Sequence, residues 1–198
     1  MVKMEQAEKT DLLARMKELA NAQHAELVNI RRHLHENPEL GFEEVATAQY
    51  IADYLAGLGL EVTSQVAKTG VVALLRGARP GKTVAIRADM DALPIQELNE
   101  VPYKSKHPGK MHACGHDAHV AAAIGAARIL WELRDQINGN VKFIFQPAEE
   151  APGGAEPMIA AGVLENPTVD AIIGGHVWGG LESGIIEVMS GPTMASAD

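Results

Sequence analysis

Three short apolar segments, each leading directly into acidic residues or a histidine, constrain the fold of this chain most. TVAIRA runs into Asp89 and Asp91, VKFIFQ into Glu149 and Glu150, and AIIGG into His176. Apolar runs of this length are typical of buried strands, and helical patterns lie between them. This alternation predicts an α/β fold: a mostly parallel mixed sheet with helices on both faces.

The first part of the chain adds helices and further strands. Residues 4–35 carry apolar residues at helical spacing, which fits one long helix or two in series, and FEEVATAQYIADYLAGLG fits another helix that glycines end. LEVTSQVA, GVVALLRG and KTVAIRAD read as strands. The tetrapeptide ARPG between the last two predicts a hairpin, and therefore an antiparallel pair.

Further along the chain, residues 91–111 show no periodicity and predict a long loop of the kind that is usually functional or disordered. Residues 117–135 look helical, with Asp117 as the predicted cap of the first turn. EPMIAAGVLEN reads as a shorter helix and SGIIEVMSG as a last strand.

Composition narrows the class of protein. A length of 198 residues suits one ordinary domain, and 46% hydrophobic with 22% charged residues is typical of soluble globular proteins. The formal net charge of -9 argues against nucleic acid or an anionic membrane surface as a partner. Since no apolar run reaches the roughly 20 residues of a membrane span, we expect a cytoplasmic protein.

The stretch MHACGHDAHV, residues 111–120, concentrates three histidines and the only cysteine of the chain. Ligands in open α/β sheets bind outside the carboxyl ends of the strands, so this stretch and the strand-end residues are expected to converge. Together they offer thiolate, imidazole and carboxylate groups, which suits one or two divalent metals. In an extended stretch Cys114 and His116 would point to the same side, with Gly115 between them.

Several roles stay open on the residues alone. Cys114 could instead be a small buried hydrophobe, and His176 a core histidine with satisfied hydrogen bonds. His112 and His119 could be metal ligands or could support them. Adjacent loop glutamates such as Glu149 and Glu150 should point in different directions, so that one binds metal and the other acts as a general base.

Five stretches in this order, RRHLHENPELGFEE, RADMDALPIQE, MHACGHDAH, QPAEEAPGGA and GGHVWGGLESG, resemble the M20 metallopeptidase family. More narrowly, they are similar to its amidohydrolase branch, which includes hippurate hydrolases, N-acyl-amino-acid amidohydrolases and plant auxin-conjugate hydrolases. The resemblance implies a zinc-peptidase-like catalytic domain with two divalent metal ions, Mn²⁺ or Zn²⁺, with Co²⁺ or Ni²⁺ also compatible.

The resemblance also implies the roles of individual residues. Glu149 would be the general base, and Asp89 would orient a ligand histidine, most simply His116. Arg87 stands where many relatives outside this branch carry a ligand histidine. The implied metal ligands are Cys114, His116, Glu150 and His176.

The implied activity is hydrolysis of the amide bond of N-acyl amino acids by a metal-activated water. A carboxypeptidase or dipeptidase of the same family is the alternative. Members of the family are longer and form homodimers through an inserted domain, so we expect residues 1–198 to be the N-terminal portion of the catalytic domain. One more metal-binding histidine would then lie elsewhere, and this chain alone could be an inactive metal-binding fragment.

Overall fold

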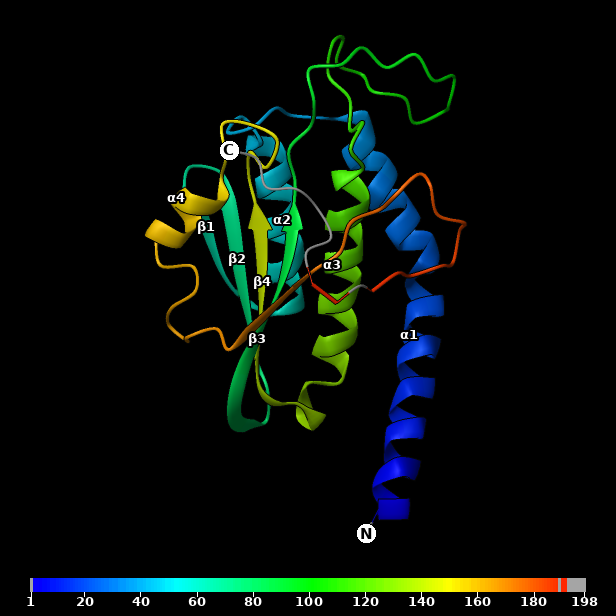
Figure 1. The fold of residues 1–198 in the computed structure, drawn as a ribbon, viewed down its shortest axis with the longest axis vertical. Coiled ribbons are helices and arrows are strands. Elements are labelled where there is room, and N and C mark those ends of the chain that lie inside the picture. The colour runs from blue at the N-terminus through cyan, green and yellow to red at the C-terminus, as the bar shows by residue number, and fades with distance from the viewer. Residues whose placement is uncertain (1, 189, 192–198) are drawn as a thin grey trace.

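A five-stranded sheet with helices on both faces forms the centre of the computed structural model, which describes residues 2–188 and 190–191. A short 3₁₀ helix, Arg134–Gln136, precedes the fourth strand. The elements in chain order are α1 (Val2–Glu36), α2 (Val45–Leu58), β1 (Glu61–Val66), β2 (Gly70–Arg76), β3 (Arg79–Asp89), α3 (His116–Glu132), β4 (Asn138–Gln146), α4 (Ala155–Ala160) and β5 (Ala171–Gly174) (Figure 1).

The strands lie in the order β1-β2-β4-β3-β5. β3 runs parallel to both β4 and β5, whereas β2 is antiparallel to β1 and β4. The register places Asp89 beside Gln146, and Arg87 beside both Ile144 and Gly174, so the carboxyl ends of the three parallel strands meet at one edge. The predicted α/β fold with a mixed sheet is confirmed, with parallel and antiparallel pairs in equal number.

The hairpin predicted at ARPG is wrong, because β4 lies between β2 and β3. The antiparallel hairpin is formed by β1 and β2 instead. Its turn contains Ala67 and Lys68, both with positive φ (50° and 77°), as in the turns that match the twist of paired strands. In this central position all residues of β4 from Val141 to Gln146 are buried.

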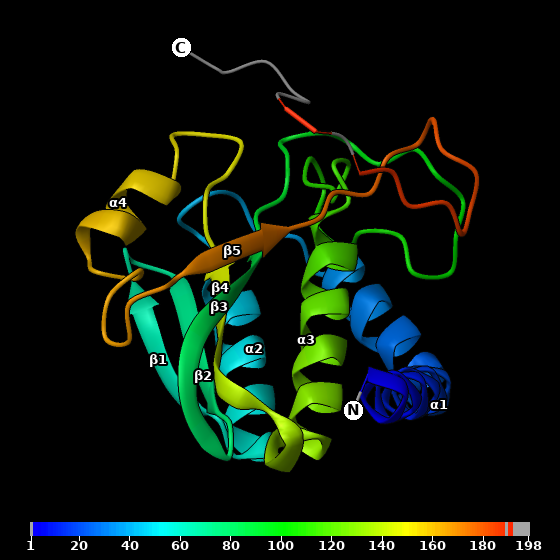
Figure 2. The ribbon, with the colours of Figure 1, turned by 60° about the horizontal axis from the view of Figure 1, so that its bottom comes forward.

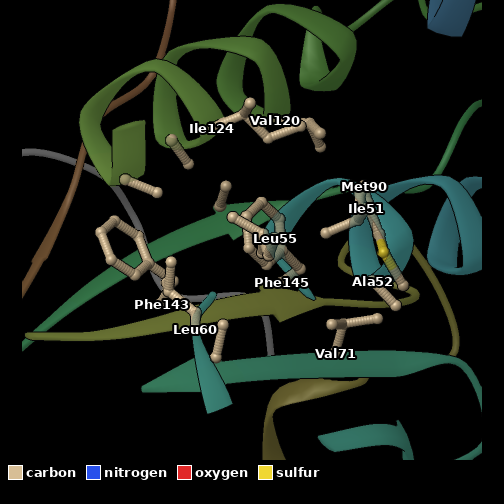
Figure 3. Packing of buried hydrophobic residues seen from close by; sticks show 14 of the residues in the cluster. Ile51, Ala52, Leu55, Leu60, Val71, Met90, Val120, Ile124, Phe143 and Phe145 are labelled. Carbon is tan, nitrogen blue, oxygen red and sulfur yellow. The ribbon is translucent and has the colours of Figure 1, made fainter. Parts of the chain in front are cut away.

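The main core lies between the sheet and the layer formed by α1, α2 and α3 (Figure 2). Ile51 and Leu55 of α2 and Ile124 of α3 pack against Phe143 and Phe145 of β4 (Figure 3). A smaller cluster on the other face of the sheet includes Met158 of α4. Helices therefore cover both faces, as predicted, and fix the position of the strand ends.

The helix predictions hold with changed bounds. Residues 2–36 form one continuous helix rather than two, and α2 ends at Gly59, whose φ of 103° is left-handed. α4 stops at Ala160, and turns follow it. Within the described part of the chain, no helix is both long enough and apolar enough to span a membrane.

Two predictions for the C-terminal part are wrong. β5, predicted as a buried strand, has every residue exposed, with Ile172 54% and Ile173 61% exposed, because neither buried cluster of the described residues extends over its faces. The segment 183–191 was predicted as a strand, but its described residues, 183–188 and 190–191, contain no strand, and residue 189 lies outside the described residues.

Candidate metal centre

Polar residues from four segments meet where the parallel strands end. β3 ends at Asp89, β4 leads to Glu149 and Glu150, and β5 leads to His176. The first turn of α3 adds His116, and Cys114 lies two residues before it. The ligand atoms of Cys114, His116 and His176 lie within 4.8 Å of one another, as do those of His116, Glu149 and Glu150. The predicted convergence is confirmed.

His116 occupies the centre of this cluster. Its ring is fully buried, and Nδ1 lies 3.2 Å from Oδ1 of Asp91, which fixes the hydrogen on Nδ1. Nε2 has no hydrogen-bond partner. It lies 3.8 Å from an oxygen of each of three carboxylates, those of Asp89, Glu149 and Glu150. An orphaned buried nitrogen facing three carboxylates is the arrangement that a cation would complete.

Burial disfavours a charge on His116, but the Asp91 hydrogen bond and the surrounding carboxylates outweigh it and raise the pKa of the imidazole. The carboxyl of Asp91 responds in the opposite sense. Burial acts to raise its pKa, yet the His116 contact and backbone N–H groups of the Glu149–Glu150 segment lower it overall. Asp91 is therefore a carboxylate that accepts the His116 N–H and holds the ring in one orientation.

Cys114 and His176 form the second pair of donors. Sγ of Cys114 lies 3.4 Å from Nε2 of His176, and Nδ1 of His176 donates to the carbonyl of Val177 at 2.6 Å. The lone pair on Nε2 thus faces the sulfur. Sulfur and nitrogen ligands at ~2.3 and ~2.0 Å from one tetrahedral metal lie roughly 3.4–3.6 Å apart, which this separation matches.

Without a cation, Cys114 is a neutral thiol. Burial, followed by the nearby carboxylates of Glu150, Glu149 and Asp89, raises its pKa to about 12. Excess negative charge around a thiol is costly unless a metal ion compensates it, and a coordinating thiol is deprotonated outright. The donor set of thiol, imidazole and carboxylate therefore fits divalent metal ions.

Gly115 lets the backbone turn between these two donors. Its φ of 86° is left-handed and it caps α3, so the stretch is not extended as the sequence predicted. A Cβ at this position would lie 2.4 Å from Cγ2 of Val177. The close approach brings the start of α3 against the segment that follows β5, and this packing places Cys114 beside His176.

The expected pairing of Asp89 with His116 is wrong. Asp91 makes that contact, whereas Asp89 accepts from Arg87 at 2.6 Å and binds Nδ1 of His119 at 2.5 Å. Burial opposes the charge on Asp89, but His119, His116 and Arg87 lower the pKa of its carboxyl. The two aspartates at the end of β3 therefore hold different histidines.

The remaining histidines of the cluster lie around the donors. Both ring nitrogens of His119 have protein partners, since Nε2 also accepts from the N–H of Val177 at 2.9 Å. His119 therefore ties α3 to the segment after β5. His112 is buried, neither ring nitrogen has a partner, and burial lowers its pKa to about 4. Among the described residues it belongs to none of the close donor groups.

The two glutamates do not point apart, as adjacent loop residues were expected to. Ala148 has a left-handed φ of 48°, and the turn that it begins brings both carboxylates toward Nε2 of His116. Glu149 is the more exposed side chain, at 39% against 29% for Glu150. The N–H of Glu150 donates to Oδ2 of Asp91, which fixes the loop beside His116.

Sequence reasoning missed a second buried polar network. Asp117, predicted to cap α3, lies inside its first turn, and Gly115 is the cap. Oδ2 of Asp117 accepts from His35 Nδ1 at 2.7 Å and from Arg31 Nε at 2.8 Å. His35 also binds Glu97 of the long loop at 3.1 Å. The sequence carried no signal for this network, because His35, Glu97 and Asp117 lie far apart in the chain.

Comparisons with known proteins agree with this geometry. Residues 85–191 match the profile of peptidase family M20/M25/M40. An N-acyl-L-amino acid amidohydrolase of Geobacillus stearothermophilus is 50% identical over 184 residues, 92% of this chain and 49% of the relative. Thermostable carboxypeptidase 2 of Saccharolobus solfataricus is 49% identical over 175 residues, 87% and 44% of the two chains.

A solved structure of the same family has a similar fold. The YXEP protein of Bacillus subtilis, described as a dinuclear metal binding peptidase from the M20 family, superposes with a TM-score of 0.83 at 48% identity. The match covers 87% of this chain and 48% of that protein. The chain thus spans slightly less than half the length of these relatives.

Proposed function

Because this chain belongs to the M20/M25/M40 peptidase family, we propose that it provides the metal centre of an enzyme that hydrolyses the amide bond of N-acyl amino acids. The observation that carries the proposal is the buried His116. Its Nδ1 is held by Asp91, and its unpartnered Nε2 faces carboxylates beside the Cys114–His176 pair. The amidohydrolase relative from Geobacillus stearothermophilus supports the substrate class.

We assign the metal-binding role to four side chains. Two divalent ions, zinc or manganese, would be held by Cys114, His116, Glu150 and His176. Bound ions of this kind acidify a water molecule and polarise a substrate carbonyl. Asp91 and the Val177 carbonyl hold the two imidazoles in the tautomers that present Nε2, and such partners typically change metal affinity 10- to 100-fold.

Glu149 is the proposed general base. It is the more exposed of the two glutamates and reaches the same region of the site, 3.8 Å from Nε2 of His116. In this role it takes a proton from the attacking water and delivers it to the leaving amine. Asp89 acts through His119 on the segment that contains His176, rather than on His116.

Metal content tests the first half of the proposal. The chain is purified without chelator and its metal is measured by mass spectrometry, with Cys114→Ala as the variant. We expect between one and two equivalents of zinc or manganese, and a lower content in the variant because a thiolate ligand is gone. Metal-free wild-type protein with an intact fold would contradict the assignment of this site.

Turnover tests the second half. Glu149→Gln should retain metal but lose about 10²- to 10⁴-fold in the rate of hippurate hydrolysis, the usual contribution of a general base. Glu156→Gln, an exposed glutamate of α4, is the matched control. Dipeptides are assayed beside hippurate and N-acetyl amino acids, because one relative is a carboxypeptidase. If dipeptides are cleaved faster than hippurate and N-acetyl amino acids, the activity is that of a peptidase rather than an amidohydrolase.

Location and assembly are further parts of the proposal. A single cysteine, placed among metal donors, fits a protein of the reducing cytoplasm. The homodimer expected from the family resemblance stays a prediction, as does the place of residues 1–198 in the N-terminal portion of the catalytic domain.

A further inference from the structure

Glu44 is a fully buried carboxylate outside the candidate metal centre. It lies directly before α2, and its two oxygens have different partners. Oε2 accepts from the hydroxyl of Thr69 at 2.6 Å, and Oε1 accepts from the N–H of Ala148 at 2.8 Å. Burying a carboxylate costs free energy, so its presence here calls for a role that an apolar side chain would not fill.

Ala148 is the residue whose conformation sets the direction of the glutamate loop. It is fully buried, has a left-handed φ of 48°, and immediately precedes Glu149 and Glu150. Its carbonyl accepts from the N–H groups of Gly153 and Gly154 at 3.1 and 2.9 Å, which closes the loop on itself. The Ala148 N–H bond to Glu44 connects this closed loop to the segment before α2.

Close packing joins the same two segments. A Cβ at Gly41 would lie 2.5 Å from the carbonyl oxygen of Ala151 and 3.0 Å from Cβ of Ala148. The backbone before α2 is thus in direct contact with the glutamate loop at Gly41, and hydrogen-bonded to it at Glu44. Asp91 holds the loop from the other side, through the N–H of Glu150.

We propose that Glu44 is a positioning residue: its hydrogen bond to Ala148 fixes the loop of residues 147–154 so that Glu149 and Glu150 face His116. The proposal rests on the proposed function for the roles of the two glutamates. Without this acceptor the buried N–H of Ala148 has no partner, and the left-handed conformation of Ala148 loses a hydrogen bond that favours it.

Variants at one position separate the hydrogen bond from packing. Glu44→Leu keeps a similar volume but removes the acceptor. Glu44→Asp keeps the charge but shortens the side chain, so that it cannot span Thr69 and Ala148. Glu44→Gln keeps an acceptor oxygen at full length. Glu43→Gln, at the neighbouring residue whose exposed carboxylate pairs with Lys110, is the matched control.

The first measurement is amide hydrogen exchange of the peptide that covers residues 147–154, on metal-free protein. We expect exchange at least about 10-fold faster in Glu44→Leu and Glu44→Asp than in wild type, as loss of one buried hydrogen bond implies. Glu44→Gln and the Glu43→Gln control should stay close to wild type. If Glu44→Leu does not fold, Glu44→Asp decides the comparison.

The second measurement is hippurate hydrolysis by manganese-loaded protein. Misplacement of Glu149 should lower kcat by about 10- to 100-fold with KM little changed, and Glu44→Gln should restore most of the rate. Unchanged loop protection and kcat in Glu44→Leu and Glu44→Asp would overturn the proposal, as would a loss in Glu44→Gln as large as that in Glu44→Leu. If wild type binds no metal and hydrolyses nothing, the proposed function fails, whereas the exchange data still decide the role of Glu44.

Discussion

Replacing His35 should destabilise the fold by an amount that depends on pH. The side chain is 4% exposed and lies between two carboxylates that are 0% and 1% exposed, those of Asp117 and Glu97. His35→Gln keeps a polar side chain of similar size but removes the charge. Leaving a buried carboxylate without its partner typically costs ~3–5 kcal/mol. Asp117 retains Arg31, and Glu97 retains the N–H of Ser105, so we expect a loss of about 2–3 kcal/mol.

The pH dependence follows from the direction of each pKa shift. The hydrogen bond to Asp117 raises the pKa of His35 above its ordinary value of 6.5, despite burial. The stabilisation is therefore complete below 6.5 and is lost as pH rises through the folded-state pKa. Burial favours the neutral form of Asp117, but His35 and other cations lower the pKa of its carboxyl overall. The contribution of Asp117 to stability is therefore lost as pH falls through this lowered pKa.

The assay is urea unfolding of wild type and His35→Gln at several pH values between about 5 and 9. The difference in free energy of unfolding should be largest near about pH 6 and should shrink toward about pH 9. His24→Gln, at an exposed histidine of the same helix, is the control. A difference that is constant across this range, or one no larger than that of the control, would refute the account of His35 as a buried imidazolium.

Two other variants probe the end of β3 and the middle of β4. Asp91→Asn should weaken zinc binding by about 10- to 100-fold, because an amide cannot accept from both His116 Nδ1 and the N–H of Glu150. Competition with a chromophoric chelator measures the affinity, and a change below twofold would contradict the role of Asp91. Lys142→Met should lower the free energy of unfolding by about 2–4 kcal/mol, because the buried ammonium donates to the carbonyls of Val163, Glu165 and Pro167. Zinc affinity of Lys142→Met should equal that of wild type, and urea unfolding with unchanged stability would show that these carbonyls find other partners.

The candidate metal donors could be brought together from the sequence because the predicted fold places their segments at one edge of the sheet. Glu150 and His176 follow parallel strands, which end at one edge, whereas Cys114 and His116 lie at the start of α3, beside that edge. The predicted fold class depends on the same pattern. The hairpin prediction at ARPG was wrong because turn residues predict only local connections. β4, which begins about 60 residues later in the chain, lies between β2 and β3 at the centre of the sheet.

The residues that hold the donors were harder to find. Asp89 and Asp91 lie two residues apart at the end of one strand, and the sequence does not distinguish which of them contacts His116 and which contacts His119. Glu44 and His35 lie more than 75 residues before the groups that they contact, Ala148 and Asp117. Periodicity predicts which face a residue occupies, but it does not predict such long-range polar contacts.

The position of β5 at the sheet edge links the stability of that strand to occupancy of the metal site. β5 contacts β3 alone, and its side chains are exposed, so it is held by few buried groups and should open at lower free energy than the central strands. His176 and Val177 follow it, and both contact the start of α3. A cation bound by Cys114 and His176 would stabilise the docked strand by the free energy of its own binding. By reciprocity, any contact that holds β5 in place would raise the affinity for the metal.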